Sequence, residues 1–179
     1  LMHVLAGLDV PSEGEVLYND KSLGDFKQNE LADFRNKTIG FVFQQFFLQP
    51  NLTVMENVEL PLKISGESKK MRQESAMKAL EEVGLVDKAK NRATDLSGGQ
   101  KQRVCIARAI VNNPEIIFAD EPTGNLDSET GAKIIELLFN LNKTLGITLV
   151  FVTHDEELAA MCDRRIFIKD GVIVKEEVK

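Results

Sequence analysis

The stretch from residue 96 to residue 122 begins with LSGGQ (96–100) and ends with EIIFADEP (115–122). The serine and two glycines are typical of a helix start, where free backbone N–H groups can hold an anion and serine serves as the N-cap. The apolar run at 115–119 indicates a buried parallel strand. Carboxylates at the C-terminal end of such a strand are well placed to hold Mg²⁺ and to orient a water. The stretch therefore predicts an α/β fold with a phosphate site, a metal site and a base, which together indicate a nucleotide hydrolase.

The remaining sequence predicts strands and helices around this run. A helical remnant at 1–8 is followed by a turn at 7–14. We expect strands at 15–18, 38–43, 116–119 and 147–153, helices at 29–35, 54–64, 68–83, 97–111 and 128–145, and a hairpin of 165–169 with 172–176. Gly84 and Gly146 are suited to end the helices before them. The chain is predicted to be one domain, residues 1–179, with a helical insertion at about 45–111 in an α/β core.

Composition excludes several classes of protein. A chain of 179 residues with 43% hydrophobic and 28% charged residues suits one globular domain with a sizeable core. The net charge of −6 disfavours a general nucleic-acid binder, which needs a basic face. No apolar run approaches the ~18 residues of a membrane span. Cys105 and Cys162 lack metal or redox spacing and are predicted to be reduced thiols of an intracellular protein.

Five motifs, in order along the whole chain, resemble those of ATP-binding cassette (ABC) ATPases. Residues 96–100 look like the signature motif, and 116–121 look like the Walker B strand with its catalytic base. Residues 124–127 (GNLD) resemble the D-loop, Gln44 the Q-loop glutamine and His154 the switch histidine. Within that family, the sequences of residues 40–46 and 120–128 are most similar to the lipoprotein-release and macrolide-export type of transporter ATPase. The resemblance implies a P-loop NTPase-like ABC ATPase core, with a mostly parallel sheet and an inserted α-helical subdomain.

The resemblance also implies a role for each site residue. Glu121 would be the general base, and His154 would contact the γ-phosphate. Asp120 would hold Mg²⁺ through water, and Gln44 would sense that ion. The signature motif would close over ATP held by the opposite subunit, and the D-loop would join the same shared site. The nucleotide-binding residues are then Gln44, Ser97, Gly98, Gly99, Gln100 and Asp127.

The cofactors implied are ATP and Mg²⁺, and the partners are a second ATPase subunit in a head-to-tail dimer and a transmembrane permease subunit. No nucleic acid is expected as a partner. The protein would be cytoplasmic and peripheral on the inner face of the cell membrane. The apolar residues at 46–48, with Leu52 and Val54, either pack the helical insertion or line a groove for a short helix of the permease.

Two other classes of function are weighed against this one: a soluble, non-transport ABC protein of DNA repair or translation, and a non-catalytic fragment. A DNA-repair member of the family would have a long coiled coil between Q-loop and signature, whereas only residues 45–95 separate them here. A translation-type member would have two cassettes, and this chain has one. A third reading is a non-catalytic fragment that offers only a partner surface. It arises because no G-x-x-x-x-G-K-[ST] phosphate loop occurs in residues 1–179.

Residues 1–8 look like the rest of the helix that follows the phosphate loop in the family. We therefore expect a glycine-rich loop ending in Gly-Lys-Ser/Thr directly before Leu1, with an aromatic residue further upstream to stack on adenine. The backbone N–H groups and the lysine of such a loop hold the β- and γ-phosphates, and nothing in residues 1–179 replaces them.

Because residues 1–179 contain no phosphate-binding loop, we expect a protein consisting of these residues alone to bind ATP very weakly. Isothermal titration calorimetry on the purified protein measures the affinity directly. Binding with a micromolar dissociation constant would contradict the prediction.

Overall fold

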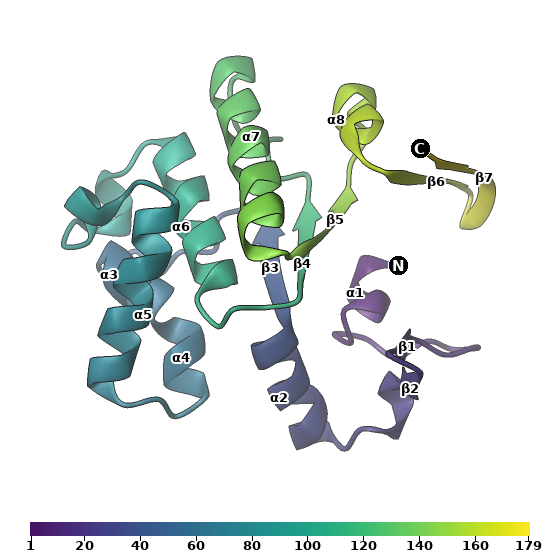
Figure 1. The fold of residues 1–179 in the computed structure, drawn as a ribbon, viewed down its shortest axis with the longest axis horizontal. Coiled ribbons are helices and arrows are strands. Elements are labelled where there is room, and N and C mark those ends of the chain that lie inside the picture. Colours follow the sequence, from purple (N-terminus) through teal and green to yellow (C-terminus); the bar gives the residue numbers. More distant parts are fainter.

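The computed structural model describes all residues, 1–179 (Figure 1). Its centre is a three-stranded parallel sheet in the order β3-β4-β5, formed by β3 (Ile39–Phe43), β4 (Ile116–Asp120) and β5 (Thr148–Val152). Two small antiparallel pairs lie outside it: β1 (Leu17–Tyr18) with β2 (Lys21–Ser22), and β6 (Arg164–Lys169) with β7 (Val172–Val178). The α/β fold with a parallel central sheet is confirmed.

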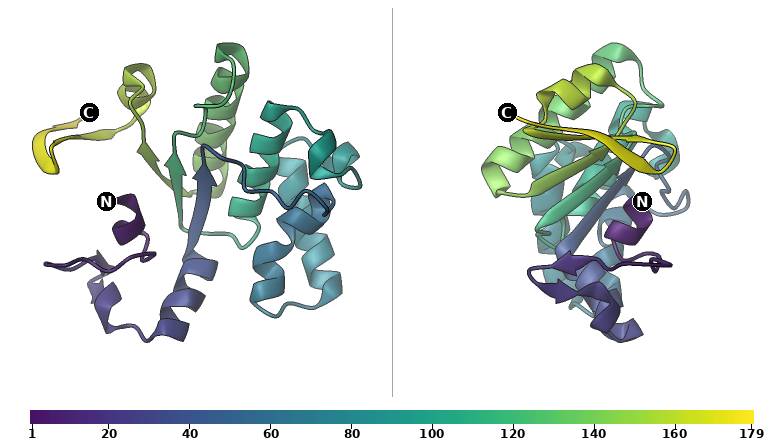
Figure 2. Two further views of the ribbon diagram at one scale, coloured as in Figure 1. Left: turned by 180° about the vertical axis from the view of Figure 1, so that it is seen from behind. Right: turned by 90° about the vertical axis from the view of Figure 1, so that its right-hand side faces the viewer.

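Side chains alternate between the two faces of each strand, and apolar residues cover the central sheet on both faces. On one face, Val42, Ile117 and Ala119 belong to a 23-residue core shared with helices α6 (Gly98–Ile110) and α7 (Ser128–Leu145). On the other face, Ile39 and Phe118 form a smaller cluster with the helix α1 (Met2–Leu5) and the residue after it. Figure 2 shows α1 and α7 on opposite sides of the strands. Both faces of the sheet are therefore apolar, as is usual for parallel strands.

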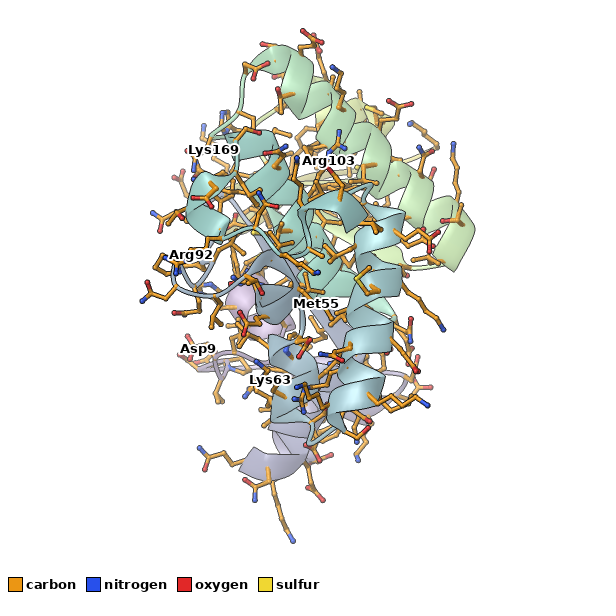
Figure 3. The ribbon with its side chains drawn as sticks, turned by 90° about the vertical axis from the view of Figure 1, so that its left-hand side faces the viewer. Asp9, Met55, Lys63, Arg92, Arg103 and Lys169 are labelled. Carbon is orange, nitrogen blue, oxygen red and sulfur yellow. The ribbon has the colours of Figure 1, made fainter.

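Four helices gather beside the sheet: α3 (Val54–Val58), α4 (Leu60–Ile64), α5 (Lys69–Glu82) and α6. Figure 3 views the molecule from this side, with Met55 on α3, Lys63 on α4 and Arg103 on α6 labelled. Helices α3, α5 and α6 pack on one another, while α6 also packs on β3 and α7. The core is consequently continuous from the helices into the sheet, and α6 is the element that both regions share.

Several predicted boundaries are confirmed because local signals set them. Helix α7 covers residues 128–145, and Gly146 ends it in the left-handed conformation at φ 69°. Gly84, at φ 67°, follows α5 in the same way. Ser97 caps α6, and the hairpin of β6 and β7 turns at Asp170 and Gly171. These ends depend on residue types within a few positions of the helix or strand.

Other predicted boundaries of helices and strands were wrong. The single helix predicted at 54–64 is two short helices, α3 and α4, separated at Glu59, because Pro61 has no N–H to continue the first helix and sits in the first turn of the second. The strand predicted at 15–18 shrinks to β1, which turns through two left-handed residues, Asn19 and Asp20, into β2. Helix α2 (Gln28–Thr38) is longer than predicted, and α8 (Glu156–Met161) was not predicted.

Gly40 in β3 provides a test of the close approach between the sheet and α6. A Cβ there would lie 2.6 Å from the carbonyl oxygen of Ala109 and 3.1 Å from Cγ1 of Ile117. We expect Gly40→Ala to lower the free energy of unfolding by about 1–3 kcal/mol, because backbone rather than a flexible side chain must move. The control is Gly24→Ala, whose added Cβ has only Ser22 Oγ nearby, at 3.6 Å. Urea denaturation measures both; equal stability of the two variants would contradict the prediction.

Candidate functional site

The three central strands end in register, and this brings the predicted catalytic residues to one edge of the sheet. Phe43 of β3 pairs with Asp120 of β4, which pairs with Val152 of β5. The residues that follow these positions therefore leave the sheet side by side. They include Gln44, Glu121 and His154, which come from three distant parts of the sequence. The carboxyl edge of a parallel sheet is where ligands bind in open α/β folds.

The Glu121 carboxylate is held by the end of β5. Its Oε1 accepts a hydrogen bond from the backbone N–H of His154 at 2.8 Å and lies 2.6 Å from Nδ1 of the same residue. Its Oε2 accepts from the Thr153 hydroxyl at 3.3 Å. The Glu121 side chain is 22% exposed, whereas that of His154 is 88% exposed. Glu121 is thus oriented by two donors, the backbone N–H of His154 and the Thr153 hydroxyl, and the imidazole beside it remains accessible from solvent.

The backbone of Glu121 is in a conformation that non-glycine residues rarely adopt, with φ 45°. Its N–H donates to the carbonyl of Val152 at 2.9 Å, and its carbonyl accepts from the N–H of Gly124 at 3.0 Å. Strained backbone of this kind costs of order 1–3 kcal/mol and concentrates at functional sites. The hydrogen bonds to Val152 and from Gly124 hold Glu121 in this conformation on both sides.

Gln44 is joined to the loop after Glu121 through Asn125. The Asn125 side-chain amide donates to the carbonyl of Gln44 at 2.9 Å, and the Gln44 amide lies 3.5 Å from Oδ1 of Asn125. Gly124 makes room for this arrangement, because a Cβ at that position would lie 2.7 Å from Nε2 of Gln44. Asn125 was part of the GNLD motif but had no role of its own in the sequence reasoning.

The starts of α6 and α7 lie against each other. A Cβ on Gly99 would lie 2.5 Å from Cγ2 of Thr130, and a Cβ on Gly98 would lie 3.3 Å from Leu126. The two glycines of the signature motif therefore have a packing reason that is independent of any ligand. Sequence reasoning gave them only a role in close approach to phosphate.

Side-chain caps close both helix starts. Ser97 Oγ accepts from the N–H of Gln100 at 3.3 Å, and the Gln100 side chain accepts from the N–H of Ser97 at 3.0 Å, which forms a capping box. At α7, Asp127 accepts from the N–H of Thr130 at 2.9 Å, and this hydrogen bond lowers the pKa of the Asp127 carboxyl. Ser97 and Asp127 are both exposed at these ends.

The site residues thus form two groups. Gln44, Asp120, Glu121 and His154 lie at the carboxyl edge of the sheet, and Ser97–Gln100 and Asp127 lie at the paired starts of α6 and α7. Nowhere do three or more His, Cys, Asp or Glu side chains converge in a way that could hold a metal ion alone. None of the helices has both the length and the apolar character needed to cross a bilayer.

Fold and site together define the class of protein. The dimeric structure of MJ0796, a bacterial ABC transporter cassette, superimposes with a TM-score of 0.86 at 46% identity, over 99% of this chain and 78% of that one. The same cassette has been solved in a post-hydrolysis state bound to ADP and Pi, again with a TM-score of 0.86. This chain therefore has the fold of an ABC ATPase cassette.

Sequence comparison gives the family. The ABC transporter family profile matches residues 1–124. The lipoprotein-releasing system ATP-binding protein LolD of Syntrophus aciditrophicus is 48% identical over 97% of this chain and 78% of its own length. The macrolide export ATP-binding/permease protein MacB of Bdellovibrio bacteriovorus is 47% identical over 99% of this chain and 27% of its own length. The chain belongs to the ABC transporter family and is an ATP-binding cassette ATPase of the lipoprotein-release and macrolide-export type.

Proposed function

We propose that, in a protein that has a phosphate-binding loop before Leu1, this chain binds ATP and Mg²⁺, forms a head-to-tail dimer with a second ATPase subunit, and hydrolyses ATP to drive a separate transmembrane permease. The observation that supports this most directly is the fixed carboxylate of Glu121 at the carboxyl edge of the sheet, directly after Asp120 and beside Gln44. Phosphoryl transfer needs charge neutralisation and an oriented nucleophile more than covalent help. The relatives named for lipoprotein release and macrolide export favour a role in release or export.

Glu121 acts as the general base in this proposal. Its carboxylate accepts the proton of the attacking water, and the hydrogen bonds from His154 and Thr153 fix where that carboxylate points. Because a carboxylate only accepts, the nearby Nδ1 of His154 carries a proton. Nε2 is then the ring atom left to meet the γ-phosphate, and it donates to phosphate only in the imidazolium form. His154 can therefore serve both the base and the phosphate.

Asp120, acting through a water molecule, and Gln44 are the residues proposed to contact Mg²⁺. They end or follow the neighbouring strands β4 and β3 and offer carboxylate and amide oxygens. Mg²⁺ in nucleotide sites keeps several waters and takes only one or two protein oxygens besides the phosphates, so this small donor set fits it. When bound, the ion neutralises charge on the phosphates.

Ser97, Gly98, Gly99, Gln100 and Asp127 are the proposed contacts to nucleotide across the dimer. The first N–H groups of α6 have no carbonyl partner within the helix, and the helix dipole favours an anion there. In this proposal the anion is the γ-phosphate held by the opposite subunit, so each site is shared between two chains. The dimeric form of the related cassette MJ0796 supports such an assembly.

The permease is proposed to dock beside the Q-loop, which places the chain on the inner face of the membrane. Of the apolar residues at 46–54, Val54 is buried in the core, whereas Phe47 is 61% exposed. Phe47 borders a groove of about 510 Å³ that also involves Leu60, Pro61 and Ile64. Such a groove suits the apolar face of a short helix. We propose residues 45–111 as the helical subdomain that presents this surface.

Glu121→Gln tests the base. In a protein that has a phosphate-binding loop before Leu1 (the loop-containing protein), we expect ATP hydrolysis to fall by roughly 10²–10⁴-fold, because the amide cannot accept the proton of water. ATP binding should survive, and His154→Ala should likewise impair turnover while sparing binding. Phosphate release measures hydrolysis, and Glu136→Gln on the exposed face of α7 is the matched control. Hydrolysis at the parent rate by Glu121→Gln would show that the base is another group.

Ser97→Asp tests the shared site. Asp is as good an N-cap as Ser, so α6 should remain folded, but its charge would repel the γ-phosphate. In the loop-containing Glu121→Gln protein, we expect ATP to produce dimers that ADP does not, because ligand binding and assembly are linked. Adding Ser97→Asp should abolish these dimers, while the neutral control Ser97→Asn should retain more of them. Sedimentation velocity distinguishes the outcomes; ATP-dependent dimers with Ser97→Asp would refute the shared site.

A further inference from the structure

Gln102 is a buried amide whose contacts converge on the catalytic edge of the sheet. Its side chain is fully buried in the second turn of α6. Nε2 donates to the carbonyl of Pro122 at 2.7 Å and to the carbonyl of Phe43 at 3.3 Å. Pro122 directly follows Glu121, and Phe43 directly precedes Gln44. One side chain therefore connects α6 to the backbone beside two of the proposed site residues.

The orientation of this amide is determined by its partners. Both partners are carbonyls, which only accept, so the NH₂ group must face them. The other end of the amide, Oε1, is buried without a hydrogen-bond partner. An unpaired buried acceptor is costly, and a leucine or methionine would fill the same space without that cost. The two hydrogen bonds that the Gln102 amide donates therefore explain why a glutamine occupies this position better than the volume of its side chain does.

Gln102 begins a row of donors along one face of α6. At the i+3 and i+6 positions, the Cys105 thiol lies 3.0 Å from the carbonyl of Phe46, and Arg108 donates to the carbonyls of Phe46 and Phe47 at 3.0 and 2.8 Å. Burial raises the pKa of the Cys105 thiol to about 11, so it keeps the proton that it donates. All three side chains bind the segment around the Q-loop, but only Gln102 also reaches the backbone after Glu121.

We propose that Gln102 is a positioning residue for ATP hydrolysis: by holding the Pro122–Thr123 peptide, one residue beyond Glu121, against α6, it keeps the Glu121 carboxylate where the attacking water must lie. This inference rests on the proposed role of Glu121 as the base. Glu121 has the strained φ of 45°, and its other backbone ties run to β5 and to Gly124. Without the Gln102 amide, the loop after Glu121 loses one of the contacts that hold this strained conformation, and the carboxylate can shift from the position that hydrolysis requires.

The same contact gives α6 a direct connection to the base. Ser97 caps the helix whose next turn contains Gln102, so a displacement of the helix start moves the Gln102 amide with it. In the proposed dimer, nucleotide held by the partner subunit contacts this helix start. Gln102 would then make the position of Glu121 depend on closure of the dimer.

Gln102→Met in the loop-containing protein tests the proposal, because methionine fills the space but donates no hydrogen bond. We expect kcat to fall by about tenfold or more while KM for ATP changes by less than about twofold, which is the pattern for an interaction that matters in the transition state. Val104→Ala is the control: it is equally buried on α6 and makes no side-chain hydrogen bond, so it should lower stability but leave kcat per folded protein unchanged. Thermal unfolding gives the folded fraction, and Gln102→Leu replaces Gln102→Met if that variant does not fold.

The double variant separates a positioning role from a merely structural one. If Gln102 acts through Glu121, then Gln102→Met should cause little further loss of kcat in the Glu121→Gln background. An unchanged kcat in the single variant, or the same fold loss in both backgrounds, would overturn the proposal. Failure of the base assignment looks different, because Glu121→Gln alone would then hydrolyse ATP at the parent rate.

Discussion

The in-register parallel pairing of β3, β4 and β5 is the constraint on which the rest of the structure depends. Phe43, Asp120 and Val152 end the three strands side by side, so the chain leaves the sheet at one edge three times. Gln44, Glu121 and His154 are neighbours only for this reason. Because side chains alternate along a strand, a shift of one residue in any strand would exchange the faces of that strand and move its site residue away from the others.

Helix α6 packs on both the sheet and the other helices, so the position of the sheet also sets the position of the helical region. It packs on β3 closely enough that Gly40 has no space for a Cβ against the carbonyl of Ala109, and its start meets α7 at Gly99 with the same lack of space. The buried core runs through α6 without interruption from the sheet to α3 and α5. Close packing on both sides fixes where α6 lies between β3 and α7. This explains how one helix can combine an anion-binding start, a core face and a row of donors to the loop after β3.

Two features at the site, each considered alone, lower the stability of the folded chain. Glu121 adopts a left-handed backbone conformation, and Gln102 leaves a buried oxygen without a partner. Each persists because surrounding contacts over-determine it, among them the hydrogen bonds from Glu121 to Val152 and from Gln102 to Pro122. The large core provides the stability that permits such costs. Local rules of stability are commonly broken where catalytic geometry is required, and both exceptions here adjoin the proposed base.

The sequence by itself determined the family, the order of the motifs and those elements whose ends are set locally, such as α7 with its Asp127 cap and Gly146. It missed the break between α3 and α4 and the helix α8, because short helices have little periodicity to detect. Only the tertiary structure decided the contacts within the site. Glu121 meets His154 across 33 residues, and Gln102 meets Phe43 across 59. Such pairs depend on strand register and on helix packing against the sheet, which are properties of the assembled fold that no local pattern encodes.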